Sequence, residues 1–97
     1  MKSVARKKDF SKMYLIILRG RLHGIGFRYA VSQYANANSF VGTVRNIPEG
    51  VEIIINDKTF LKHFDSPILS RVETQTIEEF NIIGIKYKDF RIIDSRY

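Results

Sequence analysis

The apolar residues of this chain recur with the period of a strand, then of a helix, then of strands again. Tyr14–Leu18 is a short apolar run rich in β-formers, which is typical of a central strand in a sheet. From Phe27 the apolar side chains fall at i, i+3, i+4, i+7 and i+8, which predicts an amphipathic helix that ends near Ala37. This order of periods restricts the chain to folds that alternate strands with helices.

A hairpin is expected after this helix. The segments Phe40–Ile47 and Val51–Ile55 have the apolar pattern of strands, and a turn at residues 48–50 joins them. Two strands joined by so short a turn must pair in antiparallel fashion.

The rest of the chain predicts a second helix and further strands. Asp57 can cap a short helix that carries Phe60, Leu61 and Phe64 on one side and ends at residues 65–67. Extended segments are expected at about residues 71–79 and 86–93, with a loop through Asn81 and Gly84 between them. The order is therefore β-α-β-β-α-β plus a terminal strand. We predict an α+β ferredoxin-like sandwich, in which two helices cover one face of an antiparallel sheet.

Charge is concentrated at the N-terminus. Residues 1–12 hold five basic residues and one acidic residue, and so carry most of the formal net charge of +6. We expect a disordered basic tail over residues 1–12 and one folded domain over residues 13–97. The tail alone predicts only a weak attraction for anions.

Composition narrows the class of protein. The chain contains no cysteine, which excludes disulfides and thiolate metal sites. No apolar run approaches the roughly 18 residues that span a bilayer. We therefore expect a cytoplasmic monomer without a membrane partner.

A glycine-rich turn lies between the first strand and the first helix. Gly20, Gly24 and Gly26 place successive backbone amides around a concavity at the positive end of the helix dipole, an arrangement that binds anions. The glycines could equally be turn residues with positive φ. Their spacing differs from both the dinucleotide-binding fingerprint and the P-loop.

Arg28 falls in the first turn of the predicted helix. A cation there opposes the helix dipole unless an anion is bound nearby. Its planar guanidinium can bind two phosphate oxygens at once. The alternative is an ordinary solvated charge on the helix surface.

Two segments resemble the signatures of the acylphosphatase family. Residues 20–28, GRLHGIGFR, are similar to the first signature, and residues 42–46, GTVRN, followed by Gly50, are similar to the second. The chain departs from the usual residues at Leu22, His23 and Thr43. A weaker resemblance extends over residues 14–97.

The resemblance implies a function and a set of site residues. Arg28 would grip the phosphate and Asn46 would orient the attacking water. The phosphate cradle would consist of the backbone amides of Leu22, His23, Gly24, Ile25, Gly26 and Phe27. The resemblance implies hydrolysis of small-molecule acyl phosphates to a carboxylate and inorganic phosphate, without metal or cofactor, on the ferredoxin-like fold.

The chemistry fits these residues. An acyl phosphate releases a carboxylate whose conjugate acid has a pKa of about 4, so the leaving group needs no general acid. We expect His23 to support the loop or border the substrate rather than to act as an acid or base, and His63 to be a surface residue. Tyr29 and Tyr34 on the first helix are expected to serve packing.

Two non-enzymatic functions remain open. An RNA-recognition module shares this topology, but the strand VEIII at residues 51–55 lacks the aromatic residues that such modules stack on bases, so a nucleic-acid partner is not favoured. The second is a domain that binds an acyl or carbamoyl phosphate without hydrolysing it, as a sensor or as a detached module of a larger maturation enzyme.

Overall fold

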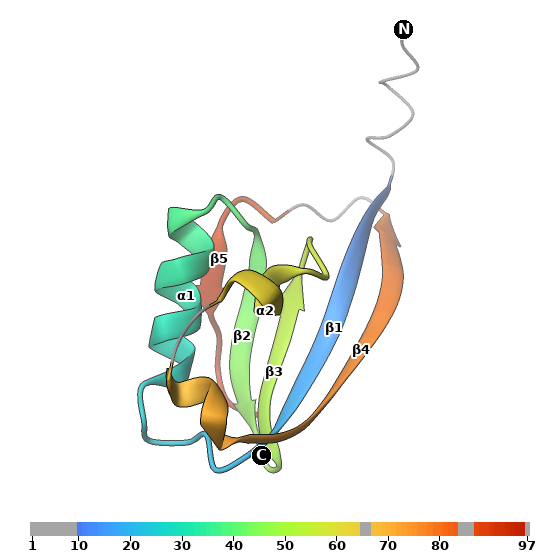
Figure 1. Cartoon of the computed structure of the whole chain (residues 1–97). Helices are drawn as coiled ribbons and strands as arrows, with labels where there is room; N and C mark the ends of the chain where they lie inside the picture. The colour runs from blue at the N-terminus through green and yellow to red at the C-terminus, as the bar shows by residue number, and fades with distance from the viewer. Residues whose placement is uncertain (1–9, 65–66, 84–86, 97) are drawn as a thin grey trace, which may run out of the picture.

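One mixed sheet forms the frame of the molecule (Figure 1). A computed structural model describes residues 10–64, 67–83 and 87–96. Within them the elements are β1 (Phe10–Gly20), α1 (Phe27–Ala37), β2 (Gly42–Ile47), β3 (Gly50–Ile55), α2 (Phe60–His63), a 3₁₀ helix (Pro67–Arg71), β4 (Val72–Ile83) and β5 (Phe90–Ile92). The strand order is β4-β1-β3-β2-β5.

The α+β ferredoxin-like sandwich is confirmed, with one difference in strand direction. β1, β3, β2 and β4 pair in antiparallel fashion, as expected. β5 pairs with β2 in parallel. The last residue of β4 and the first residue of β2 lie at the same end of the sheet. β5 also begins at that end, so it runs in the same direction as β2. Both helices lie on one face of the sheet (Figure 1).

The first helix and the hairpin follow the sequence pattern closely. α1 has the predicted bounds, while β2 begins at Gly42 rather than at Phe40. Phe40 instead packs its ring against Tyr34 and Phe60, at centroid distances of 6.4 and 5.7 Å. β3 begins at Gly50, one residue earlier than expected.

The predicted loop through Asn81 is wrong. β4 continues to Ile83, and Asn81 pairs with Lys12 of β1. The strand is longer than its own pattern indicates because the ladder to β1 extends it. Gly84, like residues 65–66, lies outside the described residues, and β5 is shorter than the expected segment 86–93.

The boundary of the predicted tail is also wrong at its C-terminal end. β1 begins at Phe10, so residues 10–12 belong to the sheet. Lys12 forms an ion pair of 3.3 Å with Glu79 on the adjacent β4, which explains how a basic residue joins the strand. Residues 1–9 lie outside the described residues, and the division into tail and domain otherwise stays a prediction.

A single hydrophobic core lies between the sheet and the helices. It includes Ile16 of β1, Ile53 of β3 and Val31 of α1, all fully buried. Phe27, the first residue of α1, packs edge-on against Phe64 after α2, with ring centroids 6.3 Å apart. This packing fixes the start of α1 against the rest of the core.

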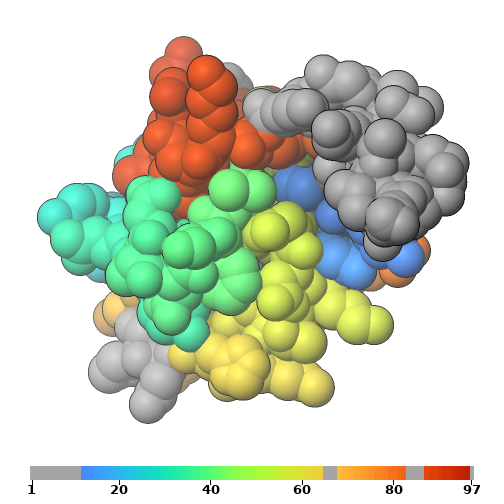
Figure 2. Space-filling model, turned by 90° about the horizontal axis from the view of Figure 1, so that it is seen from above, coloured from blue at the N-terminus to red at the C-terminus, as the bar shows by residue number. Residues whose placement is uncertain are grey.

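The C-terminal end of α1 is tied to β5. Asn36 donates from Nδ2 to the carbonyl of Phe90 at 2.9 Å, and its Oδ1 accepts from the amide of Phe90 at 3.0 Å. Figure 2 shows this end of the molecule, with the red C-terminal segment against the green residues that follow α1. None of the helices in the described ranges is long and apolar enough to cross a membrane.

Candidate active site

The loop between β1 and α1 lies beside the turn between β2 and β3, at the lower end of Figure 1. Gly24 and Gly26 have φ of 76° and 80°, in the left-handed region. A Cβ at either position would meet nothing within 4 Å. The backbone conformation, rather than a lack of space, therefore calls for glycine at both positions.

The N-terminus of α1 carries no negative group. Gly26 is the N-cap, no side chain caps the helix, and its first turn has no acidic residue. The amide of Ala30 donates to Gly26 at 3.0 Å, whereas the amides of residues 24–29 donate no hydrogen bond within the described parts of the chain. These amides are available to an anion at the positive end of the dipole.

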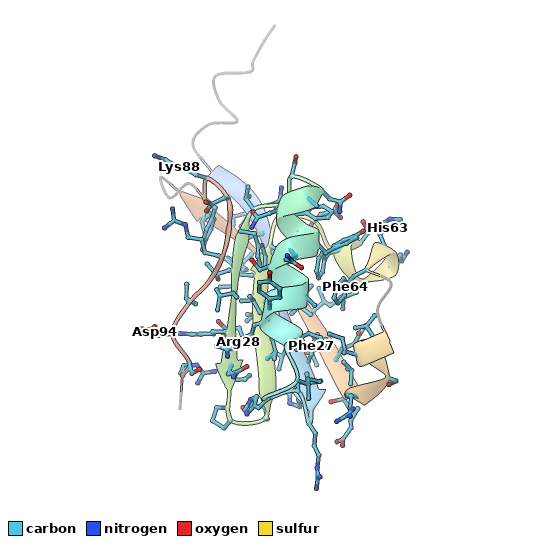
Figure 3. All side chains as sticks on the ribbon, turned by 90° about the vertical axis from the view of Figure 1, so that its left-hand side faces the viewer. Phe27, Arg28, His63, Phe64, Lys88 and Asp94 are labelled. Carbon is cyan, nitrogen blue, oxygen red and sulfur yellow. The ribbon has the colours of Figure 1, made fainter. Side chains whose placement is uncertain are left out.

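Arg28 is the second residue of α1 and is half-buried. Figure 3 places Arg28 and Phe27 at the loop end of the helix, on opposite sides of it. Among residues 10–64, 67–83 and 87–96, no carboxylate lies within ion-pair distance of Arg28. A cation so placed is unfavourable without an anion, so the helix terminus and Arg28 favour the same ligand.

These groups border one hollow of about 170 Å³. It is lined by Leu22, Gly24, Gly26, Phe27, Arg28, Tyr29 and Ile92. The structure thus brings Arg28 together with four of the six predicted cradle residues. Phosphate oxygens could accept hydrogen bonds from amides and guanidinium there.

The other two cradle residues, His23 and Ile25, do not line the hollow, and their side chains make other contacts. The ring of His23 donates from Nε2 to the carbonyls of Ile47 and Gly50, at 2.9 and 2.8 Å. Ile25 packs against the core. Because Nε2 is occupied by the hairpin turn, the geometry favours loop support for His23 over acid–base chemistry. The exposed position of His63 agrees with the expected surface residue.

Asn46 lies near the end of β2 and is 5% exposed. Its Oδ1 is buried and has no hydrogen-bond partner among the described residues. A buried acceptor without a partner costs about 1–3 kcal/mol, so a bound water or ligand that donates to this oxygen would remove that cost. Asn46 does not line the hollow, but His23 ties the loop to Ile47, its neighbour in sequence.

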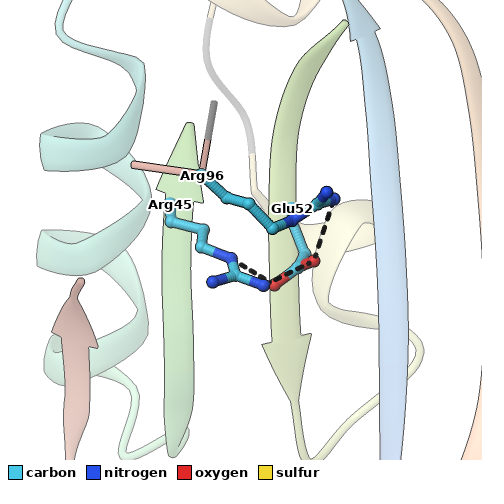
Figure 4. Close-up of polar contacts among 3 residues, drawn as sticks. All are labelled: Arg45, Glu52 and Arg96. Carbon is cyan, nitrogen blue, oxygen red and sulfur yellow. Dashed lines mark hydrogen bonds and ion pairs between the residues drawn. The ribbon is translucent and has the colours of Figure 1, made fainter. Parts of the chain in front are cut away.

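A charged cluster on the other face of the sheet was missed from the sequence (Figure 4). Arg45 donates to Glu52 from Nε and Nη2, at 2.8 and 3.3 Å. Arg96 approaches Glu52 at 3.8 Å, and its amide donates to the carbonyl of Asn46 at 2.8 Å. The cluster therefore restrains the strand at Asn46 in two ways. Arg96 binds the carbonyl of Asn46, and Glu52 binds the side chain of the preceding residue, Arg45. The hairpin register, which opposes residues 45 and 52, is the signal that could have revealed the first pair.

Within the described residues, the pKa of Asp57 is clearly shifted. The hydroxyl and the amide of Thr59 donate to Oδ1 of Asp57, at 2.6 and 2.8 Å, and hold the pKa of Asp57 below its ordinary value. The expected helix cap at Asp57 is wrong, because α2 has Thr59 as its N-cap and no side-chain capping bond. Asp57 instead stabilises the turn that precedes α2, and it belongs to the structure rather than to the site.

Fold and site together define an α+β protein with a glycine-rich loop and an uncapped helix N-terminus beside Arg28. The acylphosphatase family model matches residues 14–92. The chain is 38% identical to an acylphosphatase of Treponema denticola over 94 residues, which cover 88% of this chain and 96% of that protein. The chain belongs to the acylphosphatase family, and its activity is that of an acylphosphatase, a hydrolase.

Solved structures agree with this assignment. The acylphosphatase of Bacillus subtilis matches with a TM-score of 0.59 and 27% identity, over 84% of this chain and 98% of that one. Full-length HypF in its phosphate- and nucleotide-bound form matches with a TM-score of 0.69 and 26% identity, over 87% of this chain but 12% of that one.

Proposed function

We propose that Arg28 and the amides of residues 23–27 hold the phosphoryl group of an acyl phosphate, and that Asn46 orients the water that attacks it. The amide of Leu22, which the sequence also placed in this cradle, donates to the carbonyl of Gly20 at 3.0 Å. The observation that carries this proposal is the environment of Arg28, a cation without a carboxylate partner among the described residues, at a helix N-terminus that has no cap. The buried, unpartnered Oδ1 of Asn46 supports the second part.

The reaction needs little else from the protein. The water oxygen forms a bond to phosphorus while the bond from phosphorus to the acyl oxygen breaks. The carboxylate leaves with the electron pair of that bond, and the water gives up a proton on its way to inorganic phosphate. Since the carboxylate is a weak base, the work lies in stabilising charge on the equatorial oxygens and aligning the water. Arg28 and the loop amides supply the first, and Asn46 the second.

Hydrolysis of benzoyl phosphate in the presence of a metal chelator tests the proposal. The wild type is expected to turn over at the same rate with and without chelator. Arg28→Ala should lose both turnover and affinity for inorganic phosphate. Asn46→Ala should lose turnover and keep phosphate affinity, because it leaves the cradle intact.

Matched controls separate these effects from general damage. Arg91→Ala removes an arginine from β5, where its exposed side chain pairs with Asp89. Asn81→Ala removes an exposed asparagine from β4. Both controls should retain activity. An equal loss of phosphate affinity in Arg28→Ala and Asn46→Ala would refute the division of labour.

A second candidate function has one observation in its favour. The chain resembles a small part of HypF, and the structure with that likeness is described as phosphate- and nucleotide-bound. A domain of this kind could bind an acyl or carbamoyl phosphate without turnover. Phosphate binding without hydrolysis of either benzoyl or carbamoyl phosphate would favour this function.

The nucleic-acid alternative finds no support in the central strands. The face of the sheet away from the helices carries aliphatic and charged side chains between residues 13 and 19 of β1 and along β3. The aromatic residue of that part of β1, Tyr14, packs toward the core on the other face. The cytoplasmic location and the monomeric state stay predictions.

A further inference from the structure

Two of the three large apolar side chains that are exposed in the described residues border the same hollow. Tyr29 is 62% exposed and Ile92 is 42% exposed, and both line the hollow beside Arg28. The third, Ile77, lies on β4 at the opposite edge of the sheet. Apolar surface gathered at a concave site marks a place where a ligand covers it.

The position of each side chain follows from the fold. Phe90 and Ile92 alternate with Arg91 on β5, so both face α1. Phe90 is covered by the C-terminal end of α1, through Asn36, and is buried. Ile92 lies two residues further toward the loop, where the helix begins, and stays partly open.

Tyr29 does not pack into the core, contrary to the sequence-based expectation. It follows Arg28 in the first turn of α1, so the two side chains leave the helix roughly 100° apart. Gln33, one turn later, donates from Nε2 to the Tyr29 hydroxyl at 2.9 Å and so restrains the ring. Tyr34, by contrast, packs against Phe64 as expected, with ring centroids 5.3 Å apart.

The phosphoryl group determines where the remainder of a substrate lies. Once its oxygens are bound by Arg28 and the glycine amides, the acyl carbon is attached through a single bridging oxygen. The hollow's remaining exposed lining is formed by Tyr29 and Ile92. We propose that Tyr29 and Ile92 form an acyl subsite that selects acyl phosphates with an aromatic or branched apolar acyl group over small ones. This inference rests on the proposed phosphate site.

Comparison of benzoyl phosphate with acetyl phosphate tests the subsite. Both carry the same reacting group, so the ratio of their kcat/KM values isolates the contribution of the acyl group. Tyr29→Ala and Ile92→Ala are each expected to lower this ratio by about tenfold, the effect of one or two methylene groups in an apolar pocket. Tyr29→Phe should retain the ratio, because the ring remains.

Ile77→Ala is the matched control, since Ile77 and Ile92 are 43% and 42% exposed and undergo the same truncation. This variant should keep the wild-type ratio. An unchanged ratio in both Tyr29→Ala and Ile92→Ala would overturn the inference, and so would an equal loss for the two substrates, which would assign these residues to the phosphate cradle alone.

Binding of phosphonates keeps the test independent of turnover. By calorimetry, the wild type should bind phenylphosphonate more tightly than methylphosphonate, and Tyr29→Ala should remove the difference. If the wild type hydrolyses neither substrate but shows this difference, the proposed function fails and the apolar subsite stands. Equal affinities for the two phosphonates would refute the subsite whatever the turnover.

Discussion

Replacement of His23 by alanine should loosen the loop from the hairpin turn. In the wild type, the Nε2 proton is shared between the carbonyls of Ile47 and Gly50, at 2.9 and 2.8 Å. The amide of Gly20 also donates to the carbonyl of Glu49 in this turn, at 3.1 Å. His23 thus holds the loop between β1 and α1 beside the strand that carries Asn46.

The expected cost follows from these bonds. A single shared donor contributes between one and two net hydrogen bonds of about 0.5–1.5 kcal/mol each, so His23→Ala should lose about 1–2 kcal/mol. In a domain of this size, a loss of 1 kcal/mol lowers Tm by roughly 4–8 °C, which gives a decrease of roughly 5–15 °C. A shift of the loop by about 1 Å could also reduce kcat/KM by about 100-fold.

Thermal unfolding and benzoyl phosphate kinetics measure the two effects, with His23→Gln as the conservative variant. Glutamine retains an N–H donor on a flexible side chain. It should recover most of the lost Tm and kcat/KM. Wild-type Tm and kinetics in His23→Ala would refute the reasoning. A lower Tm with unchanged kinetics would show that the bonds stabilise the fold without positioning the cradle.

Three further predictions concern stability. Glu52→Gln removes the carboxylate that Arg45 binds in a partly buried pair, and should lower the free energy of unfolding by about 2 kcal/mol; an unchanged urea midpoint would contradict this. Gly26→Ala forces a Cβ into the left-handed region at a cost of roughly 1–2 kcal/mol, visible as a lower Tm, and an unaltered Tm would argue against backbone strain. Because hydrogen bonds from Thr59 lower the pKa of Asp57, the stability that they add is present above the unfolded pKa of 3.8 and is lost as pH falls through the folded value. The gap in unfolding free energy between wild type and Asp57→Ala should therefore shrink in acid, and a constant gap from neutral pH into acid would contradict it.

Local signals predicted the first helix, the glycine turn before it and the position of Arg28 on that helix. The bounds of α1 follow from a stripe of apolar residues, and the glycine turn precedes it directly. Arg28 could be singled out because a cation in a first helical turn is electrostatically misplaced without an anion. These inferences depend on residues close together in sequence, so the sequence alone contains most of what they need.

Long-range pairing explains what the sequence pattern missed. Residues 10–12 and Asn81 join the sheet because β1 and β4 extend each other's ladder, which no local period reveals. The burial of Glu52 depends on Arg96, 44 positions away, as well as on Arg45. The exposure of Tyr29 depends on where β5 stops covering α1. In each case a partner distant in sequence decides the environment of the residue.

The two sides of the site differ in what holds them, and this difference bears on catalysis. The phosphate side is a helix terminus with its own loop, so its amides are oriented by the same hydrogen bonds that form the helix. Asn46 lies on a strand whose backbone oxygen is bound by Arg96 and whose neighbour Arg45 is held by Glu52. In the proposed mechanism, the position of the water would therefore depend on β2, β3 and the C-terminal segment, while the position of the phosphate would depend on one loop and its helix. Since alignment of water and phosphate is the main demand of this reaction, the contacts of His23 across the two sides join the parts whose relative position matters most.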